Sequence, residues 1–165
     1  MKKIFIICSV RGASDEYVTK LERYVLSLEQ QGYSVHLPHR DTNQKAKGYD
    51  ICLENCNAIK NSDEVHVFYS SESQGTHFDM GVAFAFNRKI VVVENEKYGE
   101  GKSYPRMLDE WSNRKPKCRD CEAETAVYPD FFGGYYVACS HYQREHTQGC
   151  KKPTREQALM AYPQR

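Results

Sequence analysis

Short apolar runs and amphipathic segments alternate through the first two thirds of the chain. The apolar runs have the length and continuous hydrophobicity of buried parallel strands and occupy residues 4–7, 34–37, 65–69 and 90–93. Between and after them, the pattern predicts helices over about 15–31, 49–61, 77–87 and 105–111. This order predicts an α/β fold, a doubly wound parallel sheet of the Rossmann or flavodoxin-like kind, with helices on both faces.

Polar residues gather where the predicted strands end, which is where parallel sheets bind their ligands. Ser9, Arg11 and Gly12 follow the first strand, and His39 and Arg40 follow the second. The third strand leads into a Ser- and Gly-rich loop over 70–76, and the stretch after the fourth strand reaches Ser103. Serine, arginine and glycine suit an oxyanion, so this edge is the expected site.

The pattern changes near residue 112. Residues 112–117 are polar, contain a proline and have no periodicity, so they are interpreted as a linker between an α/β domain over 1–111 and a module over 118–165. In the module, a hairpin is expected over Tyr128–Ala138 and a helix from Thr154.

Composition excludes several classes of protein. Hydrophobic residues make up 40% of the 165 residues and charged residues 27%, and no apolar run approaches the about 20 residues of a membrane span. The apolar run at the N-terminus is too short for a signal peptide, so a cytoplasmic protein without a membrane partner is expected. A net charge of +1 gives no argument for nucleic acid.

The cysteines divide into two groups. Cys8, Cys52 and Cys56 are expected in the core, and an odd total of seven in a chain without a signal peptide argues against a disulfide framework. Four others lie in the last third of the chain: Cys118, Cys121, Cys139 and Cys150.

These four cysteines predict a structural zinc site, with iron, or free cysteines without a metal, as the alternatives. Cys118 and Cys121 are two residues apart, and Cys139 follows after 17 intervening residues, a spacing typical of zinc ribbons. The second CxxC is missing, so Cys150 is the first choice for the fourth ligand, ahead of His146 and His141. With CxxC, GGYYVACS and TREQALMAYPQR, the module resembles the small zinc ribbons of the restriction-alleviation (Lar-like) type.

The first 110 residues resemble the nucleoside 2-deoxyribosyltransferase superfamily, and most of all its nucleoside 5'-monophosphate N-glycosidases. Three segments carry the resemblance: ICSVRGAS, ENCNAIKNSDEVHVF and SESQGTHFDMGVAFAFNRKIVVV. The resemblance implies a site for a nucleoside 5'-monophosphate and a homodimer or higher homo-oligomer with shared sites.

Several residues match positions that hold the 5'-phosphate in that superfamily. Ser9, Arg11 and Gly12 match its SxRG-type loop, while Ser73, before Gly75, matches a second phosphate-binding serine. Ser103 falls where the nucleotide hydrolases place a serine that reaches the neighbouring subunit's phosphate. Each serine alone is also consistent with ordinary turn chemistry.

The positions tied to chemistry are altered. The resemblance places Asp79 where the family has its catalytic glutamate, one methylene shorter, and Asn55 where it has an aspartate. Phe5 replaces a tyrosine on the first strand. His77 is a candidate proton donor to the leaving base or a substrate contact. His39 and Arg40 match a pair that could hold the base or the sugar, or they belong to a solvated loop.

Three functions follow from these residues. The first is hydrolysis of the N-glycosidic bond of a nucleoside 5'-monophosphate, or base exchange on one, with Asp79 as nucleophile or charge stabiliser. The second is a nucleotide-binding or sensing protein that has lost catalysis. In the third, the zinc ribbon contacts nucleic acid or another protein through its excess of basic residues and through Tyr135 and Tyr136.

Overall fold

The chain forms two compact units, Met1–Ser112 and Asn113–Arg165. The structure, a computed structural model, describes residues 1–114, 125–129 and 135–139. The predicted helix from Thr154 and residues 115–117 of the predicted linker lie outside the described residues.

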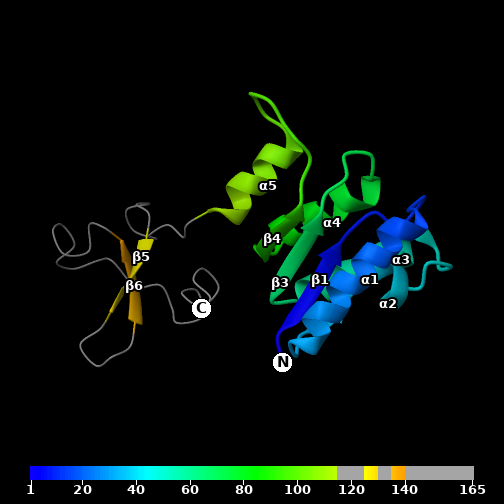
Figure 1. The fold of residues 1–165 in the computed structure, drawn as a ribbon, viewed down its shortest axis with the longest axis horizontal. Helices are drawn as coiled ribbons and strands as arrows, with labels where there is room; N and C mark the ends of the chain where they lie inside the picture. Colours follow the sequence, from blue (N-terminus) through cyan, green and yellow to red (C-terminus); the bar gives the residue numbers. More distant parts are fainter. Residues whose placement is uncertain (115–124, 130–134, 140–165) are drawn as a thin grey trace. The chain divides into compact units, whose positions relative to one another are not determined.

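A four-stranded parallel sheet forms the centre of the first unit (Figure 1). Its strands are β1 (Lys3–Ile7), β2 (Ser34–His36), β3 (Glu64–Phe68) and β4 (Lys89–Glu94), in the order β2-β1-β3-β4. Ile4 pairs with Val35 on one side and with Glu64 on the other, which places β1 inside the sheet. The predicted α/β fold is therefore confirmed.

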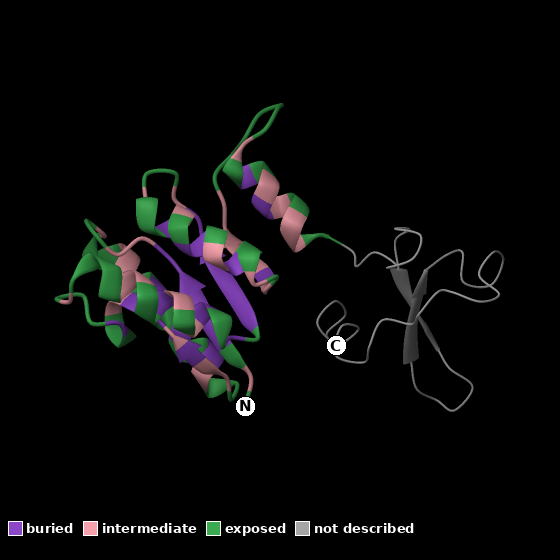
Figure 2. Ribbon diagram, turned by 180° about the vertical axis from the view of Figure 1, so that it is seen from behind, coloured by how far each residue is buried: buried purple, intermediate pink, exposed green. Residues whose placement is uncertain are grey.

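Helices cover both faces of this sheet, and Figure 2 shows the buried strands between them. The helices are α1 (Asp15–Gln30), α2 (Pro38–Asp41), α3 (Gly48–Lys60), α4 (Gln74–Ala85) and α5 (Tyr104–Ser112). Because side chains alternate along a strand, Ile4 and Ile6 pack with α1, whereas Phe5 and Ile7 pack with α3, α4 and α5. The result is two apolar cores separated by the sheet.

Capping residues explain where two of the helices begin. Ser14 caps α1 by accepting a hydrogen bond from the Tyr17 amide, as its sequence predicts. Ser73 does the same for α4 through the Thr76 amide, so α4 begins at Gln74, three residues before the predicted start. The expected loop over 70–76 is correspondingly shorter.

The second strand ends in a short helix that the sequence analysis missed. Pro38 follows β2 after one intervening residue, Leu37, and its fixed φ angle suits the first position of a helix as well as the end of a strand. His39 and Arg40 therefore lie in α2 and not in an open loop.

The described part of the second unit is an antiparallel pair, β5 (Thr125–Pro129) and β6 (Tyr135–Cys139). Tyr128 pairs with Tyr136, which agrees with the predicted hairpin. Within the described ranges of both units, no helix has the length and apolar character needed to cross a bilayer.

Candidate functional site

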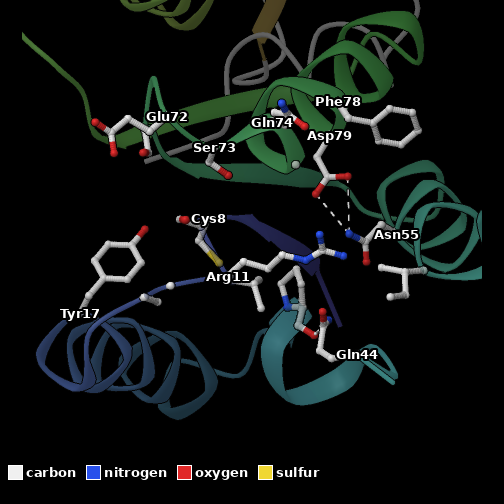
Figure 3. Close-up of a pocket in the computed structure, with 18 of the residues that line it drawn as sticks. Cys8, Arg11, Tyr17, Gln44, Asn55, Glu72, Ser73, Gln74, Phe78 and Asp79 are labelled. Atoms are coloured by element: carbon white, nitrogen blue, oxygen red, sulfur yellow. Dashed lines mark hydrogen bonds between the residues drawn. The ribbon is translucent and has the colours of Figure 1, made fainter. Parts of the chain in front are cut away.

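A pocket of about 870 Å³ opens at the carboxyl end of the sheet (Figure 3). The loops after β1 and β3 line it, together with α3 and the beginnings of α1 and α4. The chain runs from β1 outward to β2 and then crosses back to β3, so neighbouring strands β1 and β3 have connections that diverge. Such a switch point leaves a crevice for a ligand.

Asp79 is the buried carboxylate of this pocket. It lies on α4 and is 6% exposed. Burial raises its pKa from 3.8 to about 7, while a hydrogen bond from Asn55 acts in the opposite direction. Near neutral pH Asp79 is therefore present in both its ionised and its protonated form.

Asn55 faces Asp79 from α3. Its Nδ2 lies 3.2 Å from Asp79 Oδ2 and 3.5 Å from Oδ1, and both side chains line the pocket (Figure 3). An amide donates to this carboxylate where a second carboxylate would repel it. The structure thus brings together two of the predicted catalytic residues.

The other polar groups of the pocket suit an anion. Ser9, Arg11 and Gly12 line it after β1, and the Arg11 side chain extends into it (Figure 3). Gly12 has φ 70°, a left-handed conformation that favours glycine and lets the chain turn into α1. The N-terminal ends of α1 and α4, with their positive dipole ends, reach the same pocket.

Ser73 and Gly75 join this anion-binding region from the opposite loop. The Ser73 hydroxyl oxygen accepts from the Thr76 amide, which leaves the hydroxyl hydrogen free to donate to a ligand. Ser73 can therefore cap α4 and bind an oxyanion at the same time.

Four predicted site residues lie outside the pocket lining. His77 contacts Tyr69, with its Nε2 3.2 Å from the tyrosine hydroxyl, and its ring packs against Tyr104. Ser103 precedes α5, where its hydroxyl accepts from the Arg106 amide at 3.4 Å.

His39 and Arg40, the other two, contact α1. His39 Nε2 lies 3.5 Å from Glu22 Oε1, and Arg40 donates to Glu29 at 3.0 Å and to Asp41 at 2.8 Å. Because α2 is helical, both side chains lie beside α1 and outside the pocket lining.

The structure also tests what the sequence predicts for Phe5 and for the three cysteines of the first unit. Phe5 is fully buried in the core and lies outside the pocket lining. Cys8 is buried as expected, and burial together with the Asp79 charge raises its pKa to about 12. Cys52 and Cys56 are only half-buried, which corrects the expectation that they are core residues: Asn55 and Ile59 supply the buried face of α3 instead.

Several lining residues were not predicted from the sequence. Tyr17 lies in the first turn of α1, and burial raises its pKa to about 12. Phe78 lines the pocket while remaining 48% exposed, which makes it a surface on which a flat ligand could stack. Further unpredicted polar lining residues are Gln44, Glu72 and Gln74. The sequence places Tyr17 in the first turn of the helix that follows the first strand, but no motif distinguishes a pocket tyrosine there from a core tyrosine.

The predicted zinc ligands Cys118, Cys121 and Cys150 lie outside the described residues, as do His141 and His146. Cys139 ends β6. Within the part of the chain that the structure describes, no group of three or more His, Cys, Asp or Glu side chains could hold a metal ion.

Solved structures of similar fold were found, whereas no family model and no curated protein matches the sequence. A 2-deoxyribosyltransferase from Bacillus psychrosaccharolyticus is 13% identical, with a TM-score of 0.52 over 66% of this chain and 81% of that chain. This chain has the same α/β fold. The likeness at this identity concerns the fold and leaves the reaction to be argued from the site.

Two further solved structures are similar. A CMP N-glycosidase from Clostridium botulinum is 27% identical, with a TM-score of 0.47 over 68% of this chain and 84% of that chain. A 2-deoxyribosyltransferase from Leishmania mexicana is 19% identical, with a TM-score of 0.48 over 58% of this chain and 66% of that chain.

Proposed function

We propose that the protein cleaves the N-glycosidic bond of a nucleoside 5'-monophosphate, by hydrolysis or by base exchange. The observation that carries this proposal is the buried Asp79 carboxylate, which faces Asn55 in a pocket whose other polar groups suit an anion. The first 110 residues resemble nucleoside 5'-monophosphate N-glycosidases in their motifs, and this resemblance supports a nucleotide as the anionic ligand of the pocket.

The 5'-phosphate binds where the loop after β1 meets the N-terminal ends of α1 and α4. The Arg11 guanidinium supplies charge, and Ser9, Gly12 and Ser73 supply hydrogen-bond donors. A dianion at this end of the pocket fixes the position of the sugar, so that the reacting carbon lies near Asp79. Binding energy from the phosphate is thereby used to orient the bond that breaks.

Asp79 acts on the anomeric carbon. As the bond from this carbon to the base nitrogen breaks, the bonding electron pair leaves with the base, and a positive charge develops on the sugar. The ionised Asp79 stabilises that charge or attacks the carbon, and water or a second base then completes the exchange. A pKa of about 7 leaves a large share of Asp79 ionised at neutral pH.

The direct test measures base release. The full chain is incubated with ribo- and deoxynucleoside 5'-monophosphates, including 5-substituted pyrimidines, and with the corresponding nucleosides, and free base is followed by chromatography. We expect release from one or a few monophosphates, and its loss in Asp79→Asn.

A binding or sensing role is the second candidate, because Asn55, Phe5 and Asp79 replace three side chains that the resembled superfamily uses for its chemistry. Thermal stabilisation by a monophosphate without any base release would support this second role and overturn the first. Release that survives in Asp79→Asn would overturn the role of Asp79.

Two other proposals rest on the sequence. One is a structural zinc ion held by Cys118, Cys121, Cys139 and Cys150. The other is a homodimer in which Ser103 reaches the partner's ligand, and its test is the molecular mass in sedimentation equilibrium. A mass of one chain at micromolar concentration would contradict the dimer.

A further inference from the structure

A line of hydrogen bonds runs from β2, through Thr42 and α3, to Asp79 on α4. His36 Nε2, on β2, lies 2.9 Å from Thr42 Oγ1, which follows α2. Thr42 Oγ1 lies 2.9 Å from Asn55 Oδ1 on α3, and the Asn55 amide donates to Asp79 on α4. His36 and Thr42 both lie outside the pocket lining.

Counting donors and acceptors gives this line a direction. The Thr42 hydroxyl has one hydrogen, and it is donated to Asn55 Oδ1. The oxygen of Thr42 must then accept from His36, so neutral His36 carries its hydrogen on Nε2. With its oxygen engaged by Thr42, Asn55 presents its NH₂ group to Asp79. Every bond in the line therefore donates toward the carboxylate.

Burial limits the access of water to the hydrogen bonds among Thr42, Asn55 and Asp79. Thr42 is 4% exposed, Asn55 8% and Asp79 6%. A buried polar group that loses its partner is costly, so the amide keeps its oxygen on the Thr42 hydroxyl and its NH₂ group on Asp79. His36 is itself held in place, because its ring stacks on Phe5 with 5.2 Å between centroids and 14° between planes.

The orientation of Asn55 matters because an amide has two different ends. The opposite orientation would bring Oδ1 against the Asp79 oxygens and the NH₂ group against Thr42. An oxygen facing a carboxylate disfavours its charged form, whereas an N–H favours it. The orientation of the Asn55 amide therefore decides whether the ionised form of Asp79 is stabilised or destabilised.

We propose that Thr42 and His36 are positioning residues that act through Asn55, holding its NH₂ group toward Asp79 so that this carboxylate can ionise in a buried site. The expected loss of catalytic rate rests on the proposed function, whereas the expected change in the ionisation of Asp79 does not. Neither residue contacts the substrate region, and their effect is transmitted by the fixed amide.

Other titratable and charged groups face the two ends of the line. Cys8, at the end of β1, interacts with Asp79, and burial holds the pKa of its thiol far above neutrality. Arg40 and Asp41 on α2 and Glu54 on α3 act on His36, where burial is the largest influence and lowers the pKa. Burial therefore favours the neutral form of His36.

The test separates the effect on Asp79 from the effect on activity. Thr42→Val removes the hydroxyl, and Thr42→Ser restores it. Thr76→Val is the matched control, because Thr76 is a fully buried threonine on α4 whose hydroxyl has no partner among the described residues. His36→Phe keeps an aromatic ring beside Phe5 and removes the donor, and it is available should Thr42→Val fail to fold.

The first readout is the pKa of Asp79 in the full chain, measured by ¹³C-carboxyl NMR and assigned through Asp79→Asn. We expect Thr42→Val and His36→Phe to raise it by about half a unit to one unit, the equivalent of losing one oriented hydrogen bond. Thr42→Ser and Thr76→Val should keep the wild-type value.

The second readout is the pH profile of base release. Thr42→Val should lower kcat about two- to fivefold near pH 7 while leaving KM for the monophosphate within about twofold, because a smaller fraction of Asp79 is ionised. At high pH the difference should diminish.

Unchanged Asp79 titration in folded Thr42→Val or His36→Phe would overturn the positioning role. A shifted titration in a protein that releases no base would support the positioning role and overturn the proposed function instead.

Discussion

The Asn55 amide and the Asp79 carboxylate meet across the interface of α3 and α4, with 3.2 Å between Nδ2 and Oδ2. The two residues are 24 positions apart in the chain, and both are buried. Burial raises the pKa of Asp79 and the hydrogen bond from the amide moderates that rise. The two effects together give Asp79 a pKa of about 7. The contact between Asn55 and Asp79 therefore sets the ionisation of the one buried carboxylate that we propose to act in the site.

Stability should fall as pH rises through the range in which Asp79 ionises. Between pH 3.8, its ordinary value, and about 7, the native state binds more protons than the unfolded state, and the free energy of unfolding therefore decreases with pH. Relative to Asp79→Asn, the wild type should lose up to about 4 kcal/mol across this range.

The measurement is urea unfolding at several pH values, followed by fluorescence. Trp111 is the chain's single tryptophan and packs on Phe84 in the first unit, so it reports on that unit. Parallel pH dependences in the two proteins would contradict a raised pKa for Asp79.

Arg11→Ala should weaken binding of a monophosphate by about 10- to 100-fold, the range expected for the loss of a charge-assisted hydrogen bond to phosphate. Binding of the corresponding nucleoside should change little. Calorimetric titration of both ligands measures the difference, with Arg23→Ala, an exposed residue of α1 outside the pocket lining, as the control. Equal losses for both ligands would show that Arg11 does not bind the phosphate.

Thr76→Val should leave the free energy of unfolding unchanged or raise it by up to about 1 kcal/mol. The reason is that its buried hydroxyl, within the described residues, has no hydrogen-bond partner to lose. Thr42→Val should instead lower it by about 1–3 kcal/mol, because Asn55 and His36 each lose a partner. Urea unfolding followed at Trp111 compares the two, and a loss in Thr76→Val as large as that in Thr42→Val would contradict this account.

Cys8 should alkylate far more slowly than Cys52 at neutral pH. Both cysteines line the pocket, but burial and the neighbouring Asp79 charge raise the Cys8 pKa to about 12, so very little of it is the reactive thiolate. Cys52 is only half-buried. Peptide mapping after timed iodoacetamide treatment gives both rates. Asp79→Asn should speed the reaction of Cys8 modestly, and a slower reaction would argue against their interaction.

Zinc analysis of the purified full chain should find about one ion per chain, as a four-ligand structural site requires. Cys118→Ser should lower this content, whereas Cys52→Ser should not. Unfolding of the first unit, followed at Trp111, should be the same in both zinc-loaded and chelator-treated protein, because the described residues of that unit include no metal-binding group. A protein purified without zinc would refute the proposed site.

Local patterns were enough to predict most of the fold. The four strands appear within one or two residues of the predicted runs, because strands buried on both faces are continuously apolar. Helix α1 was predicted with its Ser14 cap, since a cap is a local interaction. The start of α4 was misplaced, because Ser73 can serve in a turn or as a cap, and only the chain's path decides between them.

The candidate site was predicted only in part. Asp79, Asn55 and the loop Ser9–Gly12 follow strand ends or match family segments, so sequence alone could nominate them. His39 and Arg40 were nominated on the same grounds, yet α2 directs them to glutamates of α1.

The sequence by itself determined the order of strands and helices and the edge of the sheet at which the pocket opens, because both depend on hydrophobic period and chain direction. The tertiary structure decided the environment of each group: the burial that raises the pKa of Asp79, the amide that faces it and the line from His36 through Thr42 that orients that amide. These properties arise between side chains of β2, α3 and α4 and of Thr42, which follows α2, and such contacts exist only after the chain has folded.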